Sequence, residues 1–323
     1  MKISVALCTY NGEKFLEKQL DSILNQTVPV NEIVVCDDCS KDNTISILEK
    51  YSVKYPNLFK IYKNEQNLRS NKNFEKAIKL TSGDYIFLSD QDDIWKTNKV
   101  ESILNVFKEN PKAEGVFSDA DLIDDTDKPL FNNTISLWDS VYFFEKKIPR
   151  PVDLYKILVL KGNFLTGATL CIKKEVKEFC FPFQTIENIF LHDEWFAYIL
   201  TQRKTLYYST DKLISYRIHS NQQMGVGNII NNHKKIKKDS SILDLTLGIR
   251  KPKSFKDYKT ISRALFIQYE KYKLLSENNE ALNKLTSDLL EAYLAADQKM
   301  KETNPILYFF RKRKDKKKGK RQL

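Results

Sequence analysis

The sequence predicts an α/β fold with a mostly parallel central sheet flanked by helices. Short apolar segments alternate with amphipathic helical segments through the first hundred residues, and a cluster of polar residues follows each apolar segment. The predicted strands are 3–7, 33–36, 59–62 and 85–88, and the predicted helices are 12–25, 44–55 and 73–80. This alternation is typical of a parallel sheet with right-handed crossovers and helices on both faces.

The periodicity of each segment supports these assignments. Ile3 to Leu7 is an apolar run typical of a buried strand, whereas the following segment repeats its apolar residues at helical spacing. Residues 40–43, Ser-Lys-Asp-Asn, are suited to the start of the second helix. Further along, 100–109 predicts a helix and 164–170 a strand in which Gly167 permits either close approach of an acceptor or a bulge.

Polar side chains gather at the carboxyl ends of the four predicted strands, where ligands of such sheets bind. The clusters are 9–12, 37–40, 64–67 and 90–93. In the last of them, alternation along an extended chain lets Asp90 and Asp92 face one ligand while Asp93 points elsewhere. Carboxylates this close need a cation or water, although acidic turns often only face solvent. A second acidic cluster, at Asp119, Asp121, Asp124 and Asp125, is expected to decorate a loop.

The composition limits the possible functions. The five cysteines are an odd number, which argues against a disulfide framework. No signal peptide precedes Lys2, and no apolar stretch is long enough to span a bilayer. No G-x-G-x-x-G or G-x-x-x-x-G-K-[ST] motif is present, so neither a dinucleotide-binding site nor a P-loop is supported.

The net charge of +11 is concentrated near the C-terminus. Residues 311–321 contribute +8, which leaves +3 for the rest of the chain, so no nucleic-acid partner is expected. The apolar and aromatic residues 305–310 precede this basic run, a pattern that favours an anionic membrane surface. The alternatives are a disordered solubilising tail or residual RNA affinity. We expect a cytoplasmic protein, peripheral at the inner face of the cell membrane.

Several motifs together resemble family 2 glycosyltransferases with the GT-A fold, a Rossmann-like α/β fold. These motifs are Thr9-Tyr10-Asn11-Gly12, Asp37-Asp38-x-Ser40-x-Asp42, Gly83-Asp84-Tyr85 and Asp90-x-Asp92-Asp93. The resemblance covers roughly residues 1–225. It implies inverting transfer of a sugar from a nucleotide-diphosphate donor, with Mn²⁺ or Mg²⁺ as cofactor.

The resemblance also implies roles for individual residues. The nucleoside-binding positions are Thr9, Tyr10, Asn11, Asp37 and Asp38. Asp38 is a suitable acceptor for the imide N–H of uracil or thymine. Asp92 is expected to bind the metal, with Asp90 reaching either the ribose or the metal. Arg69, Asn71 and Asn73, on the loop and helix start after the third strand, are candidates for phosphate contacts, and the alternative for Arg69 is a side chain that only faces solvent.

The second half supplies the remaining expected groups. In His192-Asp193-Glu194-Trp195, Asp193 matches the family's general base, and Glu194 is the alternative base. The non-catalytic alternative is that these acidic residues only stabilise the amino terminus of a helix. In 216–225, the Y-R-x-H pattern implies that Arg217 pairs with phosphate and His219 binds the metal. The Q-x-x-R-W motif of processive members is absent, which favours a single addition.

We therefore predict three regions and one leading function. Residues 1–230 form the catalytic domain, 231–304 a helical extension of two or three helices within 240–302, and 305–323 an apolar and polybasic tail. The predicted enzyme is a hexosyl- or rhamnosyltransferase that uses a UDP- or dTDP-sugar and a glycan or lipid-linked acceptor in cell-surface polysaccharide biosynthesis. A sugar nucleotidyltransferase and a non-catalytic nucleotide- or sugar-binding protein are the alternatives.

Overall fold

The computed structural model describes residues 1–133, 135–140, 153–185, 190–219, 245, 250–276 and 282–317. The chain divides into two compact units. The first comprises Met1–Phe143 and Asn163–Asn232, and the second comprises Phe144–Gly162 and His233–Leu323. The domain boundary predicted at residue 230 lies outside the described residues, as do residues 220–225 of the Y-R-x-H segment and residues 318–323 of the tail.

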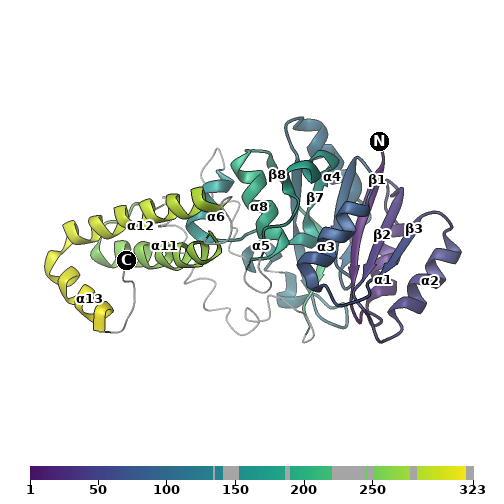
Figure 1. The fold of residues 1–323 in the computed structure, drawn as a ribbon, viewed down its shortest axis with the longest axis horizontal. Coiled ribbons are helices and arrows are strands. Elements are labelled where there is room, and N and C mark those ends of the chain that lie inside the picture. Colours follow the sequence, from purple (N-terminus) through teal and green to yellow (C-terminus); the bar gives the residue numbers. More distant parts are fainter. Residues whose placement is uncertain are drawn as a thin grey trace. The chain divides into compact units, whose positions relative to one another are not determined.

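The first unit is built on a mixed sheet whose described strands follow the order β3-β2-β1-β4-β7-β6-β8-β5 (Figure 1). The strands are β1 (Ile3–Thr9), β2 (Glu32–Asp37), β3 (Phe59–Lys63), β4 (Tyr85–Ser89), β5 (Ile94–Trp95), β6 (Gly115–Ile123), β7 (Cys171–Lys173) and β8 (Leu206–Arg217). Strands β1 to β4 pair in parallel, as does β6 with β8. Strand β7 is antiparallel to β4 and β6, and β5 is antiparallel to β8. The predicted parallel core is therefore confirmed.

Helices cover both faces of this sheet (Figure 1). Helices α1 (Leu16–Leu24), α2 (Thr44–Lys54) and α4 (Lys99–Glu109) share one hydrophobic cluster with alternate residues of β1 such as Val5 and Leu7. Helices α3 (Arg69–Leu80) and α8 (His192–Gln202) contact each other on the other face. The shorter helices are η1 (Leu130–Asn133), α5 (Leu137–Ser140), η3 (Gly167–Thr169), η4 (Lys174–Val176) and α7 (Lys177–Cys180). All five cysteines are free thiols.

Two local predictions were wrong. Residues 164–170 do not form a strand, because their chain turns through η3, where the Thr169 hydroxyl and amide both donate to Thr166 O. Asp119 does not lie in a loop but within β6, where it is buried and accepts the backbone N–H groups of Ala120 and Trp138. Asp121 also lies in β6 and pairs with two lysines.

The second unit is helical in its described part, as predicted. It contains α6 (Leu154–Lys161), α11 (Phe255–Ser276), α12 (Asn283–Thr303) and α13 (Pro305–Lys317). The sequence placed residues 154–161 in the catalytic domain, but α6 contacts α11 and α12 instead. Tyr155 donates its hydroxyl to Asp288 at 2.5 Å, and Gln268 donates to Lys161 O at 3.1 Å.

Residues 305–317 of the predicted tail form helix α13, which rules out a disordered tail over this range. The helix is fixed to α12 by polar contacts at Asp297, which accepts the Tyr308 hydroxyl at 2.6 Å and pairs with Lys312 at 2.9 Å. Arg311 and Asp315 are buried beside this contact. Among the described helices, none combines the length and the apolar character that a bilayer crossing requires.

Candidate active site

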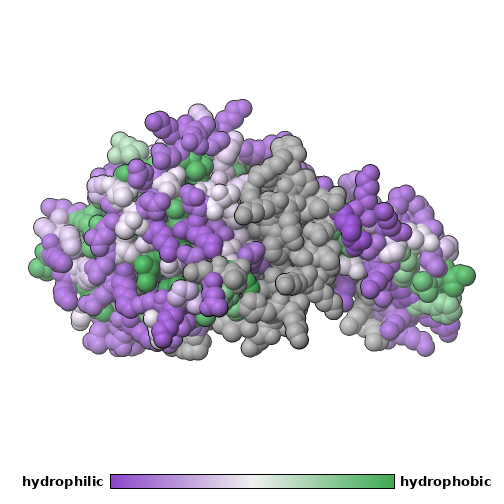
Figure 2. Space-filling model, turned by 180° about the vertical axis from the view of Figure 1, so that it is seen from behind, coloured by the Kyte–Doolittle hydropathy of each residue, from purple (hydrophilic) through white to green (hydrophobic). Residues whose placement is uncertain are grey.

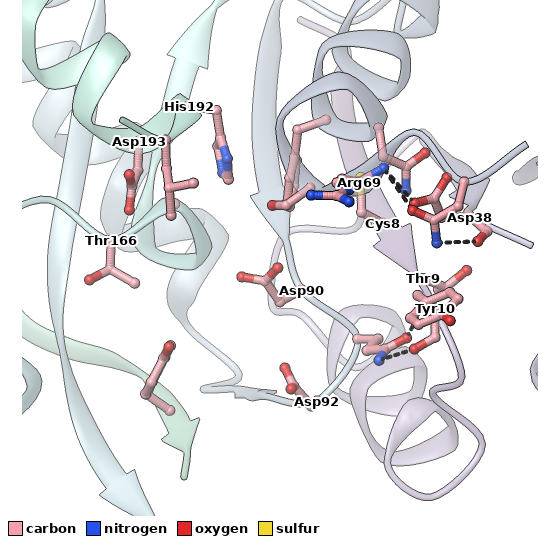
Figure 3. Close-up of a pocket in the computed structure, with 18 of the residues that line it drawn as sticks. Cys8, Thr9, Tyr10, Asp38, Arg69, Asp90, Asp92, Thr166, His192 and Asp193 are labelled. Atoms are coloured by element: carbon pink, nitrogen blue, oxygen red, sulfur yellow. Dashed lines mark hydrogen bonds between the residues drawn. The ribbon is translucent and has the colours of Figure 1, made fainter. Parts of the chain in front are cut away.

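A cavity of about 210 Å³ lies at the carboxyl ends of β1, β2 and β4 in the first unit. Its walls come from the loops after these strands, from the start of α3, from Thr166 and Gly167, from the start of α8 and from the end of β8. We call it the candidate pocket. Figure 3 shows Thr9, Tyr10 and Asp38 on one side and Thr166, His192 and Asp193 on the other, with Asp90 and Asp92 between them.

The loop after β1 is fixed to the loop after β4 by one side chain. The Tyr10 N–H donates to Gln91 Oε1 at 2.8 Å, and Gln91 Nε2 donates to Tyr10 O at 2.9 Å. Gly12 faces the same side chain, and an added Cβ there would collide with it. Tyr10 is 47% exposed and lines the pocket, so it can contact a ligand. Gln91 thus fixes the relative positions of two pocket loops.

Asp38 lines the candidate pocket and also holds the loop after β3. Its carboxylate accepts the backbone N–H groups of Leu68 at 2.7 Å and Arg69 at 2.8 Å, and the Asn64 amide at 2.8 Å. These bonds stabilise Arg69 in the left-handed region, at φ 61°. The Arg69 side chain reaches the pocket (Figure 3). Asn73 also lines the pocket, but its amide donates to Cys36 O at 2.9 Å.

Two predicted nucleoside-binding residues do not line the candidate pocket. Asp37 is buried and accepts the hydroxyl groups of Thr9 at 2.8 Å and Ser40 at 2.5 Å. Asn11 accepts the Lys41 N–H at 2.8 Å and has φ 49°. Both residues shape the loops after β1 and β2, because their polar groups are used within those loops.

Two carboxylates, Asp90 and Asp92, lie in the middle of the candidate pocket, and a third, Asp193, lies on the side of Thr166 and His192 (Figure 3). Burial, together with the negative charges of Asp92 and Asp193, raises the pKa of Asp90 to about 7. Asp92 Oδ2 lies 2.9 Å from His219 Nε2, and both side chains are mostly buried. Burial and the neighbouring aspartates also raise the pKa of the Tyr216 hydroxyl, which lines the same wall. The pocket therefore concentrates negative charge that a cationic ligand would relieve.

Asp93 points away from the pocket, as the alternation predicted. It is buried, and its Oδ1 accepts the Arg217 N–H at 3.0 Å. Its Oδ2 has no hydrogen-bond partner among the described residues. The fully buried Lys99 contributes a positive charge near Asp93 and Asp90, while its Nζ donates to Ala168 O at 2.9 Å and lies 3.8 Å from the centre of the Trp95 ring.

Arg217 does not reach the candidate pocket, so its predicted phosphate contact is not supported. Its fully buried guanidinium donates to Asp92 O and to Asp124 O, each at 2.7 Å, and pairs with Asp127 at 2.6 Å. It also lies 4.4 Å from the centre of the Phe15 ring. The side chain turns inward because these partners lie on that side of β8. Arg217 therefore stabilises the loop of residues 90–93 from the side away from the pocket.

The predicted metal ligands come together only in part. Asp92 and His219 are in contact, and Asp90 lies near them. Across the described ranges, no three His, Cys, Asp or Glu side chains form a group that could hold a metal ion. The carboxylates of Asp92 and Asp90 still fit Mg²⁺ or Mn²⁺, because Mg²⁺ usually takes one or two carboxylates and completes its shell with water and substrate phosphates.

The two predicted general bases differ in position. Asp193 lines the candidate pocket in the first turn of α8, and its Oδ1 accepts the Glu194 N–H at 2.7 Å. Glu194 is buried and does not line the pocket. Consecutive helical residues point about 100° apart, so only one of them can face the ligand space. The geometry favours Asp193 over Glu194.

Several residues of the pocket wall had no role in the predicted site. These are Cys8, Asn67, Ser70, Phe74, Gln91, Thr166, Leu191, His192 and Tyr216. Gln91 and Tyr216 could have been predicted as pocket residues, because they lie within the motifs at 90–93 and 216–225. The sequence could not predict that both Thr166 and Gly167 line the pocket. In the predicted strand these neighbours would point to opposite faces, whereas the turn at η3 brings both to the pocket wall.

Replacing Arg217 with Gln should lower the free energy of unfolding by about 3 kcal/mol, because it removes the buried partner of Asp127 and of two carbonyl groups. Urea denaturation measures this. Lys50→Gln, in an exposed pair with Glu17, is the control and should change stability by less than about 1 kcal/mol. If the variant kept its stability but no longer bound diphosphate, the structural role would be contradicted and Arg217 would be a ligand-binding residue.

Comparison with known proteins identifies the family. Residues 4–156 match the model of "Glycosyl transferase family 2". The chain is 31% identical over 238 residues to the dTDP-rhamnosyl transferase RfbG of Shigella flexneri, covering 68% of this chain and 73% of that protein. It is 32% identical over 180 residues to a poly(ribitol-phosphate) beta-glucosyltransferase of Bacillus spizizenii, covering 52% of this chain and 27% of that protein.

The fold is also found in solved structures. S. aureus TarS 1-349, crystallised in complex with UDP-GlcNAc, superposes with a TM-score of 0.53 at 16% identity, covering 91% of this chain and 73% of that one. This likeness confirms the predicted GT-A architecture. The family-model match and the Shigella flexneri relative decide in favour of an enzyme of this family over a nucleotidyltransferase or a binding protein. The chain belongs to glycosyltransferase family 2 and is a glycosyltransferase.

Proposed function

We propose that this enzyme transfers a single sugar from a UDP- or dTDP-sugar to a hydroxyl group of a glycan or lipid-linked acceptor, with inversion at the anomeric carbon. One observation carries this proposal. The candidate pocket has groups suited to a nucleoside at Thr9, Tyr10 and Asp38, and a carboxylate, Asp193, on the opposite side (Figure 3). Asp90 and Asp92 lie between them, where a diphosphate would bridge the two ends.

In this mechanism Asp193 accepts the proton of the acceptor hydroxyl as its oxygen attacks the anomeric carbon. The bond to the donor phosphate breaks at the same time, and the nucleoside diphosphate leaves with the electron pair. Attack from the side opposite the leaving group inverts the anomeric configuration. Arg69, a cationic side chain that lines the pocket, would contact the diphosphate.

Asp92 and His219 would hold Mn²⁺ or Mg²⁺, with Asp90 directed to the ribose or to the cation. When bound, such a cation supplies charge neutralisation for the leaving diphosphate. The role of this chain's residues is to hold the ligand atoms in place. Asp92 is positioned by Arg217, which binds its carbonyl, and its carboxylate is positioned by His219.

The relatives support a role in cell-surface polysaccharide synthesis. The Shigella flexneri protein is named for transfer from a dTDP-sugar, and the Bacillus spizizenii protein for glucosylation of poly(ribitol phosphate). We propose a related acceptor for this enzyme. The absence of a Q-x-x-R-W motif supports single addition.

The Asp193→Asn variant should lose about 10³-fold in turnover, because the amide cannot accept the acceptor proton. Release of nucleoside diphosphate is measured with dTDP-rhamnose, UDP-glucose, UDP-galactose and UDP-GlcNAc in the presence of Mn²⁺ and a cell-envelope glycolipid fraction. Glu194→Gln is the matched control and should retain far more activity if it folds normally. Full turnover by the Asn variant would contradict the base assignment, and no turnover of any donor by the wild type would contradict the proposed function.

We further propose that α13 rests on an anionic membrane surface at the cytoplasmic face. The support is an exposed apolar patch of Ile306, Leu307, Phe309 and Phe310, each 49% to 70% exposed. It appears as a green cluster at the right-hand end of Figure 2. The exposed residues Arg313, Lys314, Lys316 and Lys317 follow it on the same helix. Apolar anchors beside basic residues suit anionic lipid headgroups.

Replacing Phe309 and Phe310 together with Ser should reduce binding to vesicles that contain phosphatidylglycerol by about tenfold or more, because it removes two apolar anchors. Co-sedimentation measures the bound fraction. Leu294→Ser removes a residue on α12 that is 49% exposed and should leave binding unchanged. Equal binding of the double variant and the wild type would contradict the membrane role of this patch.

A further inference from the structure

The imidazole of His192 has two ring nitrogens without a hydrogen-bond partner among the described residues. The residue is 6% exposed, and both Nδ1 and Nε2 are buried and unsatisfied in the part of the chain that the structure describes. The ring lines the candidate pocket and points toward the space between Asp193 and Asp90 (Figure 3). Leaving a buried donor or acceptor unpaired costs about 1–3 kcal/mol, so such a ring calls for a partner.

The surrounding structure holds the ring in this orientation. It stacks on Phe74 with the ring centres 4.2 Å apart and an interplanar angle of 25°. The backbone N–H of His192 donates to Asn71 Oδ1 at 2.8 Å, which fixes the start of α8 against α3. The opposite wall is Gly167, where an added Cβ would lie 2.7 Å from Nε2. The glycine is therefore needed for the ring to lie where it does.

The chemistry of the ring limits what can bind there. Burial lowers the pKa of His192 to about 3, so the imidazole is neutral at physiological pH and is a poor base. A neutral imidazole offers one N–H donor and one lone-pair acceptor. A hydroxyl group has the same two capacities and can pair with either nitrogen. A phosphate or carboxylate can only accept, and an ammonium can only donate.

The position of the His192 ring indicates which hydroxyl groups of the substrates can reach it. His192 lies next to Asp193 in sequence and on the side of the pocket away from Thr9 and Asp38 (Figure 3). A nucleotide sugar bound with its base at Thr9 would direct its sugar ring to this side. The hydroxyl groups of a sugar ring are thus the uncharged, two-way hydrogen-bonding groups expected here.

We propose that His192 hydrogen-bonds a ring hydroxyl of the sugar bound beside Asp193 and so determines which sugars the enzyme accepts. The inference rests on the proposed function. His192 binds the hydroxyl without taking its proton, and Gly167 leaves room for the imidazole ring. A site built around a buried hydrogen-bonding group rejects a sugar that lacks the matching hydroxyl, because the group is then left unpaired.

The first test compares the wild type with His192→Phe, which keeps a flat ring against Phe74 but cannot form hydrogen bonds. Calorimetry measures the affinity for the nucleotide sugar that the wild type turns over fastest, for the corresponding nucleoside diphosphate, and for deoxy analogues of that donor. We expect the Phe variant to bind the nucleoside diphosphate as the wild type does. Its affinity for the nucleotide sugar should fall about tenfold, and its discrimination against one deoxy analogue should disappear.

The source of the hydroxyl is distinguished by the two substrates. If it belongs to the donor sugar, the loss appears in donor binding without acceptor. If it belongs to the acceptor, donor binding is unchanged and the acceptor KM rises about tenfold. Unchanged donor affinity, acceptor KM and discrimination would overturn the proposal. Failure of the wild type to turn over any nucleotide sugar would instead defeat the proposed function.

A second measurement on the unmodified chain avoids any folding defect of the variant. The chain has three histidines, at 192, 219 and 233, so a protein labelled with ¹⁵N-histidine gives few imidazole signals. The His192 ring nitrogens should shift when the nucleotide sugar, or the sugar acceptor, is added, but not when the bare nucleoside diphosphate is added. His219 contacts Asp92 and should respond to the diphosphate, which makes it the internal control. No response of His192 to either sugar would also overturn the proposal.

Discussion

Mutual repulsion among the carboxylates that follow β4 is the constraint on which the rest of the site depends. Asp90, Asp92 and Asp93 stand within four residues, and Asp193 adds a further charge across the pocket. Burial makes this repulsion stronger, which raises the pKa of Asp90 to about 7 and that of Asp93 well above its usual value. A fold that concentrates carboxylates in this way is stable only if other groups hold the loop in place.

The supporting groups each connect the aspartate loop to another element. Arg217 binds the Asp92 carbonyl from β8, and Gln91 binds the backbone of Tyr10 after β1. Lys99 lies beneath the loop and binds Ala168 O, next to Gly167 in the pocket wall. The same contacts that stabilise the carboxylates therefore set the distance between the nucleoside side and the sugar side of the pocket. Stability and ligand geometry are coupled through this loop.

The parts of the site that could be predicted from the sequence are those set by local geometry. The strand-end rule located Asp90 and Asp92, and alternation along an extended chain correctly turned Asp93 away from them. Arg217 was misassigned because a residue at the end of a strand can point to either side, and only the positions of Asp124, Asp127 and Phe15 decide which. Residues 164–170 were wrongly predicted as a strand, because a short apolar run that contains a glycine is compatible with either a strand or a turn.

Other features depend on contacts between distant segments and carry no local signal. Helix α6 precedes the second half of the catalytic unit in sequence, yet it packs on α11 and α12 through Tyr155 and Gln268. The environment of the His192 ring, whose nitrogens have no partner in the described part of the chain, depends on Phe74 and Gly167, which are distant in sequence. Asp38 was expected to bind a nucleobase. Its hydrogen bonds to the loop after β3 could not be predicted, because that loop meets Asp38 only in the folded chain.

We propose that a cation compensates the carboxylates between the two sides of the pocket when a diphosphate binds. Calorimetric titration of UDP and dTDP into the full chain, with Mn²⁺ or with EDTA, tests it most directly. We predict that Mn²⁺ tightens binding of at least one nucleotide about tenfold or more, and that Asp92→Asn removes most of this gain. Equal affinity with and without the cation would contradict the claim.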